Sequence, residues 1–104
     1  MKIQINTDNN IVGREQMVNH YETVLTDALS RFSDHITRLE VHLSDENSHK
    51  EGTEDKRCLL EARIENLKPL AVSHNAPSLH EAVSGSIEKL KKSMDSALGK
   101  LRNY

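Results

Sequence analysis

The sequence is poor in aromatic residues, which make up 3% of its 104 residues and include no tryptophan. With so few large rings, the core must be built mainly from Ile, Val, Leu, Met and Ala packed between layers, as in small α/β domains. The chain is long enough for one such core and too short for two ordinary domains. We therefore expect residues 1–104 to form a single domain.

Cysteine and long apolar runs are also scarce. The lone Cys58 excludes an internal disulfide, and its place in an apolar alternation predicts a small core side chain in a reducing compartment. The N-terminus lacks the apolar segment of a signal peptide, and no apolar run approaches the ~20 residues that a membrane span requires. We expect a cytoplasmic protein that has no contact with a membrane.

A large excess of positive charge is missing too. Fourteen basic residues face sixteen acidic ones, for a formal charge of −2, whereas nucleic-acid-binding domains usually carry a basic footprint. The charge is uneven, because residues 78–104 hold 5 basic and 3 acidic side chains. Only this last segment is net positive.

Apolar periodicity predicts six elements. Strands are expected at about 2–6, 36–44, 56–66 and 70–74, and helices at about 14–32 and from Ser78 to the end of the chain. Ser78 and Glu81 have the spacing of a capping box, which marks the start of the second helix. The order is β-α-β-β-β-α. We expect an α+β fold with two helices packed on one face of a four-stranded sheet, whose other face meets solvent.

The connecting segments follow from their polar residues. We expect a turn at 8–10, a helix cap at Gly13, a long hairpin loop at 45–55 and a tight turn at 67–69. Gly85 and Gly99 are expected on the outer face of the last helix.

Residues that could carry catalysis or bind metal show no supporting pattern. Cys58 and Ser84 lack the surroundings of a nucleophile, and the acidic residues of the 45–55 segment lack the spacing of a calcium loop. None of the six histidines shows an H-x-x-x-H spacing; His42 and His74 are expected to share the sheet without forming a closed site. We expect no enzyme, no metal site and no cofactor.

Several segments together resemble the ribosome-associated inhibitor and hibernation-promoting factors, a family that also includes protein Y and the sigma-54 modulation proteins. The likeness rests on the order of three segments: residues 3–11 (IQINTDNNI), 31–36 (RFSDHI) and 88–90 (EKL). It spans essentially the whole chain and implies a fold like that of double-stranded-RNA-binding domains.

This resemblance implies a site and a partner. Members of the family lie in the mRNA and tRNA channel of the 30S subunit, alone or within the 70S ribosome, where basic helix residues contact 16S rRNA phosphates and block translation. The residues that match or could assist are Lys89, Lys92, Lys100, Arg102, Arg31, Arg14 and Lys91. Longer members carry an additional dimerisation domain, so the resemblance implies a monomeric short form that acts as a translation inhibitor or hibernation factor.

Helical spacing supports such a site. At 100° per residue, Lys89 and Lys100 fall within about 20° of each other, and two basic rows flank the buried stripe of the last helix. Ser96 and Leu98 replace lysines that are usual in the family, and Glu22 and Asp27 on the first helix would repel phosphate. A second interpretation therefore stays open: a protein-interaction module of the same fold that has lost binding to ribosomal RNA.

Overall fold

The computed structural model describes residues 1–8, 14–45 and 56–102, with side chains as far as Gly99. Its elements are β1 (Lys2–Thr7), α1 (Arg14–Ala28), the short 3-10 helix η1 (Ser30–Phe32), β2 (Ile36–Asp45), β3 (Lys56–Ile64), β4 (Leu70–Ala76) and α2 (Leu79–Arg102). The predicted β-α-β-β-β-α order is confirmed. The predicted cap at Gly13, most of the 8–10 turn and nearly all of the 45–55 loop lie outside the described residues.

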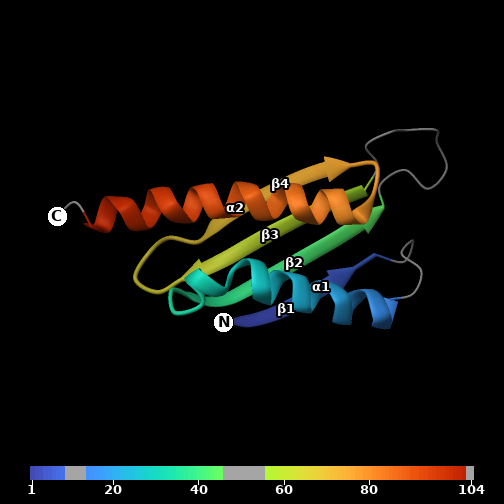
Figure 1. Ribbon diagram of the computed structural model, residues 1–104, viewed down its shortest axis with the longest axis horizontal. Helices are drawn as coiled ribbons and strands as arrows, with labels where there is room; N and C mark the ends of the chain where they lie inside the picture. Colours follow the sequence, from blue (N-terminus) through green and yellow to red (C-terminus); the bar gives the residue numbers. More distant parts are fainter. Residues whose placement is uncertain (9–13, 46–55, 103–104) are drawn as a thin grey trace.

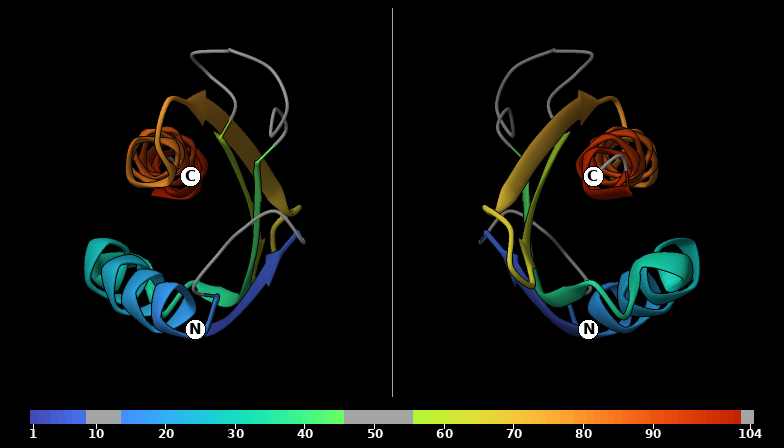
Figure 2. Two further views of the ribbon diagram at one scale, coloured as in Figure 1. Left: turned by 90° about the vertical axis from the view of Figure 1, so that its right-hand side faces the viewer. Right: turned by 90° about the vertical axis from the view of Figure 1, so that its left-hand side faces the viewer.

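The four strands form one mixed sheet in the order β1-β2-β3-β4. β1 runs parallel to β2, and the other neighbours are antiparallel. The sheet is curved, and both helices lie on its concave side, α1 near β1 and β2, and α2 near β3 and β4 (Figures 1 and 2). No helix of the described chain covers the convex side. The expected one-sided packing is therefore confirmed, and the convex face of the sheet is the outer face.

The core lies between the helices and the concave face of the sheet. From Leu39 onward in β2, after a register shift between Ile36 and Arg38, and from Cys58 onward in β3, every second residue points inward. The six central ones are at most 2% exposed: Leu39, Val41, Leu43, Cys58, Leu60 and Ala62. Leu25 of α1 and Leu90 of α2 are fully buried against this layer. Burial of each such leucine contributes about 1.5–3 kcal/mol, so aliphatic residues supply most of the core of this aromatic-poor chain.

The capping box predicted for the second helix is present. The backbone N–H of Glu81 donates to Ser78 Oγ at 3.2 Å, and the Ser78 hydroxyl donates to the Glu81 carboxylate at 3.1 Å. In a standard capping box the carboxylate accepts from the backbone N–H of the serine, whereas here the Glu81 carboxylate accepts from the Ser78 hydroxyl. The cap still satisfies a donor at the start of α2.

Two predicted boundaries were wrong. The first helix was expected to reach Phe32, but the α-helix ends at Ala28 and the chain tightens into η1, where the Phe32 N–H donates to the Leu29 carbonyl at 2.9 Å. This tighter turn carries the Phe32 ring into the core at 2% exposure. The turn expected at 67–69 lies earlier, because Asn66 adopts a left-handed backbone with φ of 65° that ends β3 at Ile64.

The expected position of Gly85 on the outer face of its helix was also wrong. Gly85 packs against the ring of His74 on β4, and a Cβ added to it would lie 2.1 Å from His74 Cδ2. A glycine is therefore required for this close approach. Gly99 has nothing within 4 Å of the same position, which agrees with the expected outer location.

Candidate nucleic-acid interface

Lys89 and Lys92 lie on the flank of α2 that borders β4. The Lys89 ammonium donates to the carbonyl of Ser73 at 2.8 Å, and the exposed Lys92 lines a shallow groove with Leu70 at the start of β4. Residues three apart on a helix are surface neighbours, with Cβ atoms about 5–6 Å apart. The structure thus brings these two lysines together, and Lys89 is also bonded to β4, an edge strand of the sheet that the described residues form.

Lys91 lies on the opposite flank of α2. Its ammonium is 3.8 Å from the Glu88 carboxylate. Asp95, one turn further along the same flank, pairs with Arg31 of η1, so this flank of α2 is the one that faces α1. Lys100 and Arg102 belong to the last turn of α2, but their side chains lie outside the described residues. Their place in the two basic rows stays a prediction from helical spacing.

Arg31 does not belong to the same basic surface as Lys89 and Lys92, because its guanidinium is paired with Asp95. Its two terminal nitrogens donate to the two carboxylate oxygens of Asp95 at 2.8 and 3.0 Å, and its guanidinium lies 4.0 Å from the centre of the Phe32 ring. The pKa of Arg31 is raised because Asp95 accepts hydrogen bonds from the charged guanidinium. A phosphate that binds Arg31 has to compete with this two-pronged contact.

Arg14 lies apart from the other basic candidates. It is the exposed first residue of α1, and a 15-residue helix is about 22 Å long, so Arg14 and Arg31 mark opposite ends of this segment. Between them the exposed surface of α1 carries Glu15, Glu22 and Asp27. The first helix therefore offers no continuous basic surface.

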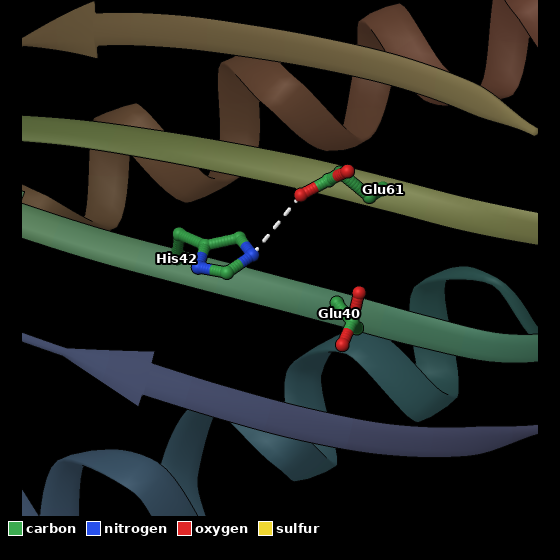
Figure 3. Close-up of side chains that lie close together, drawn as sticks. All are labelled: Glu40, His42 and Glu61. Atoms are coloured by element: carbon green, nitrogen blue, oxygen red, sulfur yellow. Dashed lines mark ion pairs between the residues drawn. The ribbon is translucent and has the colours of Figure 1, made fainter.

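A second group of polar side chains, two carboxylates and one imidazole, lies on the outer face of the sheet; the sequence did not reveal that they lie together. Glu40 and His42 project from β2, and Glu61 projects from β3 (Figure 3). The cross-strand pairing places Glu61 opposite Glu40, and this register cannot be read from local periodicity. His42 and His74 share the sheet as expected, but on opposite faces, since His74 packs inward on Gly85.

Cys58 has the properties of a core residue. Its side chain is fully buried, and burial raises the pKa of the thiol to about 11. Ser86 Oγ lies 3.1 Å from Cys58 Sγ and 2.9 Å from the Val83 carbonyl, so a polar link joins β3 to α2 inside the core. At neutral pH the thiol keeps its proton and is a poor nucleophile.

The arrangement of the elements defines the class of the protein, a small α+β domain with two helices on one face of a mixed sheet. None of the helices in the described chain is long and apolar enough to span a membrane. Residues 3–102 match the family described as Sigma 54 modulation protein / S30EA ribosomal protein, and the chain belongs to this family. Such ribosome-associated modulation factors are not normally enzymes.

Two solved structures share the fold. The N-terminal domain of protein Y from Thermus thermophilus is 16% identical, with a TM-score of 0.69 over 89% of this chain and 94% of that one. A ribosomal subunit interface protein from Coxiella burnetii is 11% identical, with a TM-score of 0.71 over 95% of this chain and 99% of that one. A search of curated protein sequences found no match. At these identities the structural likeness supports the fold alone.

Proposed function

We propose that this chain is a ribosome-associated translation inhibitor or hibernation factor that binds the mRNA and tRNA channel of the 30S subunit. Membership of a ribosome-associated family supports the partner, and the partner would place the protein in the cytoplasm. The role requires no catalytic residue, since occupation of the channel is enough to block translation.

The observation that carries this proposal is the flank of α2 formed by Lys89 and Lys92. Both residues are exposed and close together. Lys92 makes no ion pair with any described residue, and Lys89 bonds to a neutral carbonyl. The nearby acids Glu88 and Asp95 are paired with Lys91 and Arg31, so neither lysine of this flank is held in an ion pair with a described residue. Two adjacent lysines of this kind suit the phosphate backbone of RNA, which binds through charge and without regard to base sequence.

The remaining candidates are assigned smaller roles in this proposal. Lys100 and Arg102 would extend the two basic rows along α2, and Lys91 would act from the flank that faces α1. Arg31 would contribute only after release from Asp95, and Arg14 only where the RNA reaches the far end of α1. The proposed likeness to double-stranded-RNA-binding domains would give a shared shape for RNA contact.

Sedimentation with ribosomal particles tests the proposal. Purified protein is layered with isolated 30S and 70S particles on sucrose at ~50 mM and ~200 mM monovalent salt, a range over which phosphate-driven binding falls steeply. Stoichiometric co-sedimentation that weakens with salt is the expected result. An absence of binding at the lower salt concentration would contradict the proposal.

A second candidate function is supported by the acidic surface of α1. Asn19, Glu22, Thr23, Thr26 and Asp27 line a shallow exposed groove on this helix. Such a surface suits a basic protein partner better than RNA. If this module has lost RNA binding, charge reversal at Lys89 and Lys92 will leave its complex with a protein partner mostly intact. Charge reversal at Glu22 and Asp27 will abolish that complex.

A further inference from the structure

Three possible metal ligands converge on the outer face of the sheet. The ligand atoms of Glu40, His42 and Glu61 all lie within 4.8 Å of one another. They project from the two central strands, on the side away from both helices (Figure 3). Because pairing on both sides holds β2 and β3 in register, the three side chains start from fixed backbone positions.

The distance between His42 and Glu61 is close to the separation of two atoms that bind one ion. Nε2 of His42 lies 3.1 Å from Oε1 of Glu61. Two ligand atoms that each lie about 2.0–2.2 Å from one ion, at a near-tetrahedral angle, are separated by roughly 3.3–3.6 Å, and by about 3 Å at a right angle. The pair therefore needs little movement to bind an ion between its members.

The same nitrogen lacks a hydrogen bond. Nε2 of His42 is shielded from solvent and has no hydrogen-bond partner in the described part of the chain. Its contact with Glu61 is short enough for an ion pair but is not aligned as a hydrogen bond. A bound ion would give this shielded nitrogen a direct ligand bond in place of that poorly aligned contact.

The charges around these side chains favour a cation. Glu40 and Glu61 are directly opposite each other across β2 and β3, an arrangement that is unfavourable for like charges. Arg38 lies 3.3 Å from the Glu40 carboxylate and also donates to the side chain of Gln4. Lys2 and Arg63 lie beside Arg38 on the same face but form no ion pair with either glutamate, so Glu61 pairs with no lysine or arginine of the described chain. Next to Glu61 on β4 lies Ala71, whose small side chain leaves that side open.

We propose that Glu40, His42 and Glu61 form a binding site for a divalent first-row transition metal ion. One imidazole nitrogen and two carboxylate oxygens suit Zn²⁺ and its neighbours, whereas Mg²⁺ and Ca²⁺ prefer oxygen ligands alone. The three side chains are 29–45% exposed, which leaves water as the remaining ligand. This inference does not depend on ribosome binding.

Calorimetric titration of the full chain with Zn²⁺ tests the site. The expected result is one ion per chain, with a rise in melting temperature as the ion binds the folded state. His42→Ala and Glu61→Gln each remove a ligand and should lower the affinity at least as much as the roughly 10- to 100-fold that loss of a supporting outer-shell group costs. His20→Ala is the matched control, because His20 is exposed on α1 and its loss should leave the affinity unchanged.

A gain-of-affinity variant separates this site from general binding to surface histidines. Arg38→Gln removes the cation that competes for Glu40 and should raise the Zn²⁺ affinity. The melting temperature without metal checks the fold, and Glu61→Gln should preserve or raise it by removing like-charge repulsion. An absence of stoichiometric Zn²⁺ binding to the parent chain, or binding that persists in the His42→Ala/Glu61→Gln double variant, would overturn the proposal.

Discussion

The two helices cover the same face of the sheet but differ in both attachment and charge. α2 is joined to the sheet by the His74–Gly85 packing, the Cys58–Ser86 contact and the bond from Lys89 to β4. α1 meets the sheet through Tyr21, Leu25 and several half-buried apolar residues. α2 carries two exposed lysines, Lys89 and Lys92, on one flank, whereas most charged residues on the exposed surface of α1 are acidic. α2 is therefore the more firmly attached of the two helices, and it presents the exposed lysines that can contact RNA.

The largest effect should follow from reversal of charge on α2. Lys89→Glu with Lys92→Glu places two negative charges where phosphates would bind, so ribosome affinity should fall on the order of 100- to 1,000-fold. The dependence of affinity on salt should also become shallower. Quantitative co-sedimentation over a salt series measures both effects.

A matched control has the same change in net charge. Lys2→Glu with Arg63→Glu reverses two exposed cations on the outer face of the sheet, far from the α2 flank. This control should bind almost as well as the parent chain. An equal loss of affinity in both double variants would show that net charge, and not the flank of α2, governs binding.

Cys58 is buried beneath α2, so the free energy of unfolding should decrease at alkaline pH. The thiol pKa is raised by burial from 9.0 to about 11, so the unfolded chain ionises first. Stability is complete below pH 9 and declines as the pH rises toward 11, by about 3 kcal/mol at ~1.4 kcal/mol per pH unit. Urea unfolding between pH 8 and ~11 measures this decline.

Cys58→Ala should flatten that profile, although the cavity it leaves lowers stability at every pH. Some decline should persist at the highest pH, because burial also raises the pKa of Tyr21. An unchanged slope in Cys58→Ala would contradict the assignment of the effect to the thiol.

Substitution of the two glycines of α2 by alanine should change the stability of the protein in opposite directions. Gly85→Ala drives a methyl group into the His74 ring, and overpacking of this kind costs about 1–3 kcal/mol. Gly99→Ala meets open space and should stabilise the helix by up to about 1 kcal/mol. Chemical denaturation compares the two variants. Addition of His74→Ala to Gly85→Ala should recover part of the loss, and a destabilised Gly99→Ala would contradict the comparison.

The smallest effect, a change in ribosome affinity, should come from loss of the contact between Arg31 and Asp95. Asp95→Asn weakens the two-pronged contact and frees a guanidinium for phosphate, so ribosome affinity should rise a few-fold. Co-sedimentation near the midpoint of the salt series is sensitive enough to detect this change. Glu65→Gln removes an exposed acid in the turn after β3 that forms no ion pair with a described residue; it is the control and should have less effect.

Local patterns in the sequence predicted most of the fold. Alternation in β2 and β3 placed the inward residues correctly, and the Ser78–Glu81 spacing fixed the start of α2. Helical spacing likewise predicted that Lys89 and Lys91 lie on different flanks of the buried stripe. These features depend on residues close in sequence, which share one helix or strand.

Contacts between distant segments could not be predicted in this way. The engagement of Arg31 by Asp95 joins residues 64 positions apart, and the pairing of Glu40 with Glu61 depends on strand register. The need for Gly85 arises from a ring on another strand. The candidate site thus looked more basic in the sequence than in the fold, where Asp95 neutralises Arg31.

Lysine footprinting of the chain bound to 30S particles tests most directly whether α2 is the RNA-contacting element. Acetylation is measured by mass spectrometry for free and bound protein, with the exposed Lys2 on β1 as the internal control. Lys89 and Lys92 are predicted to lose reactivity on binding while Lys2 keeps it. Full reactivity of Lys89 and Lys92 in the bound protein would contradict the central claim.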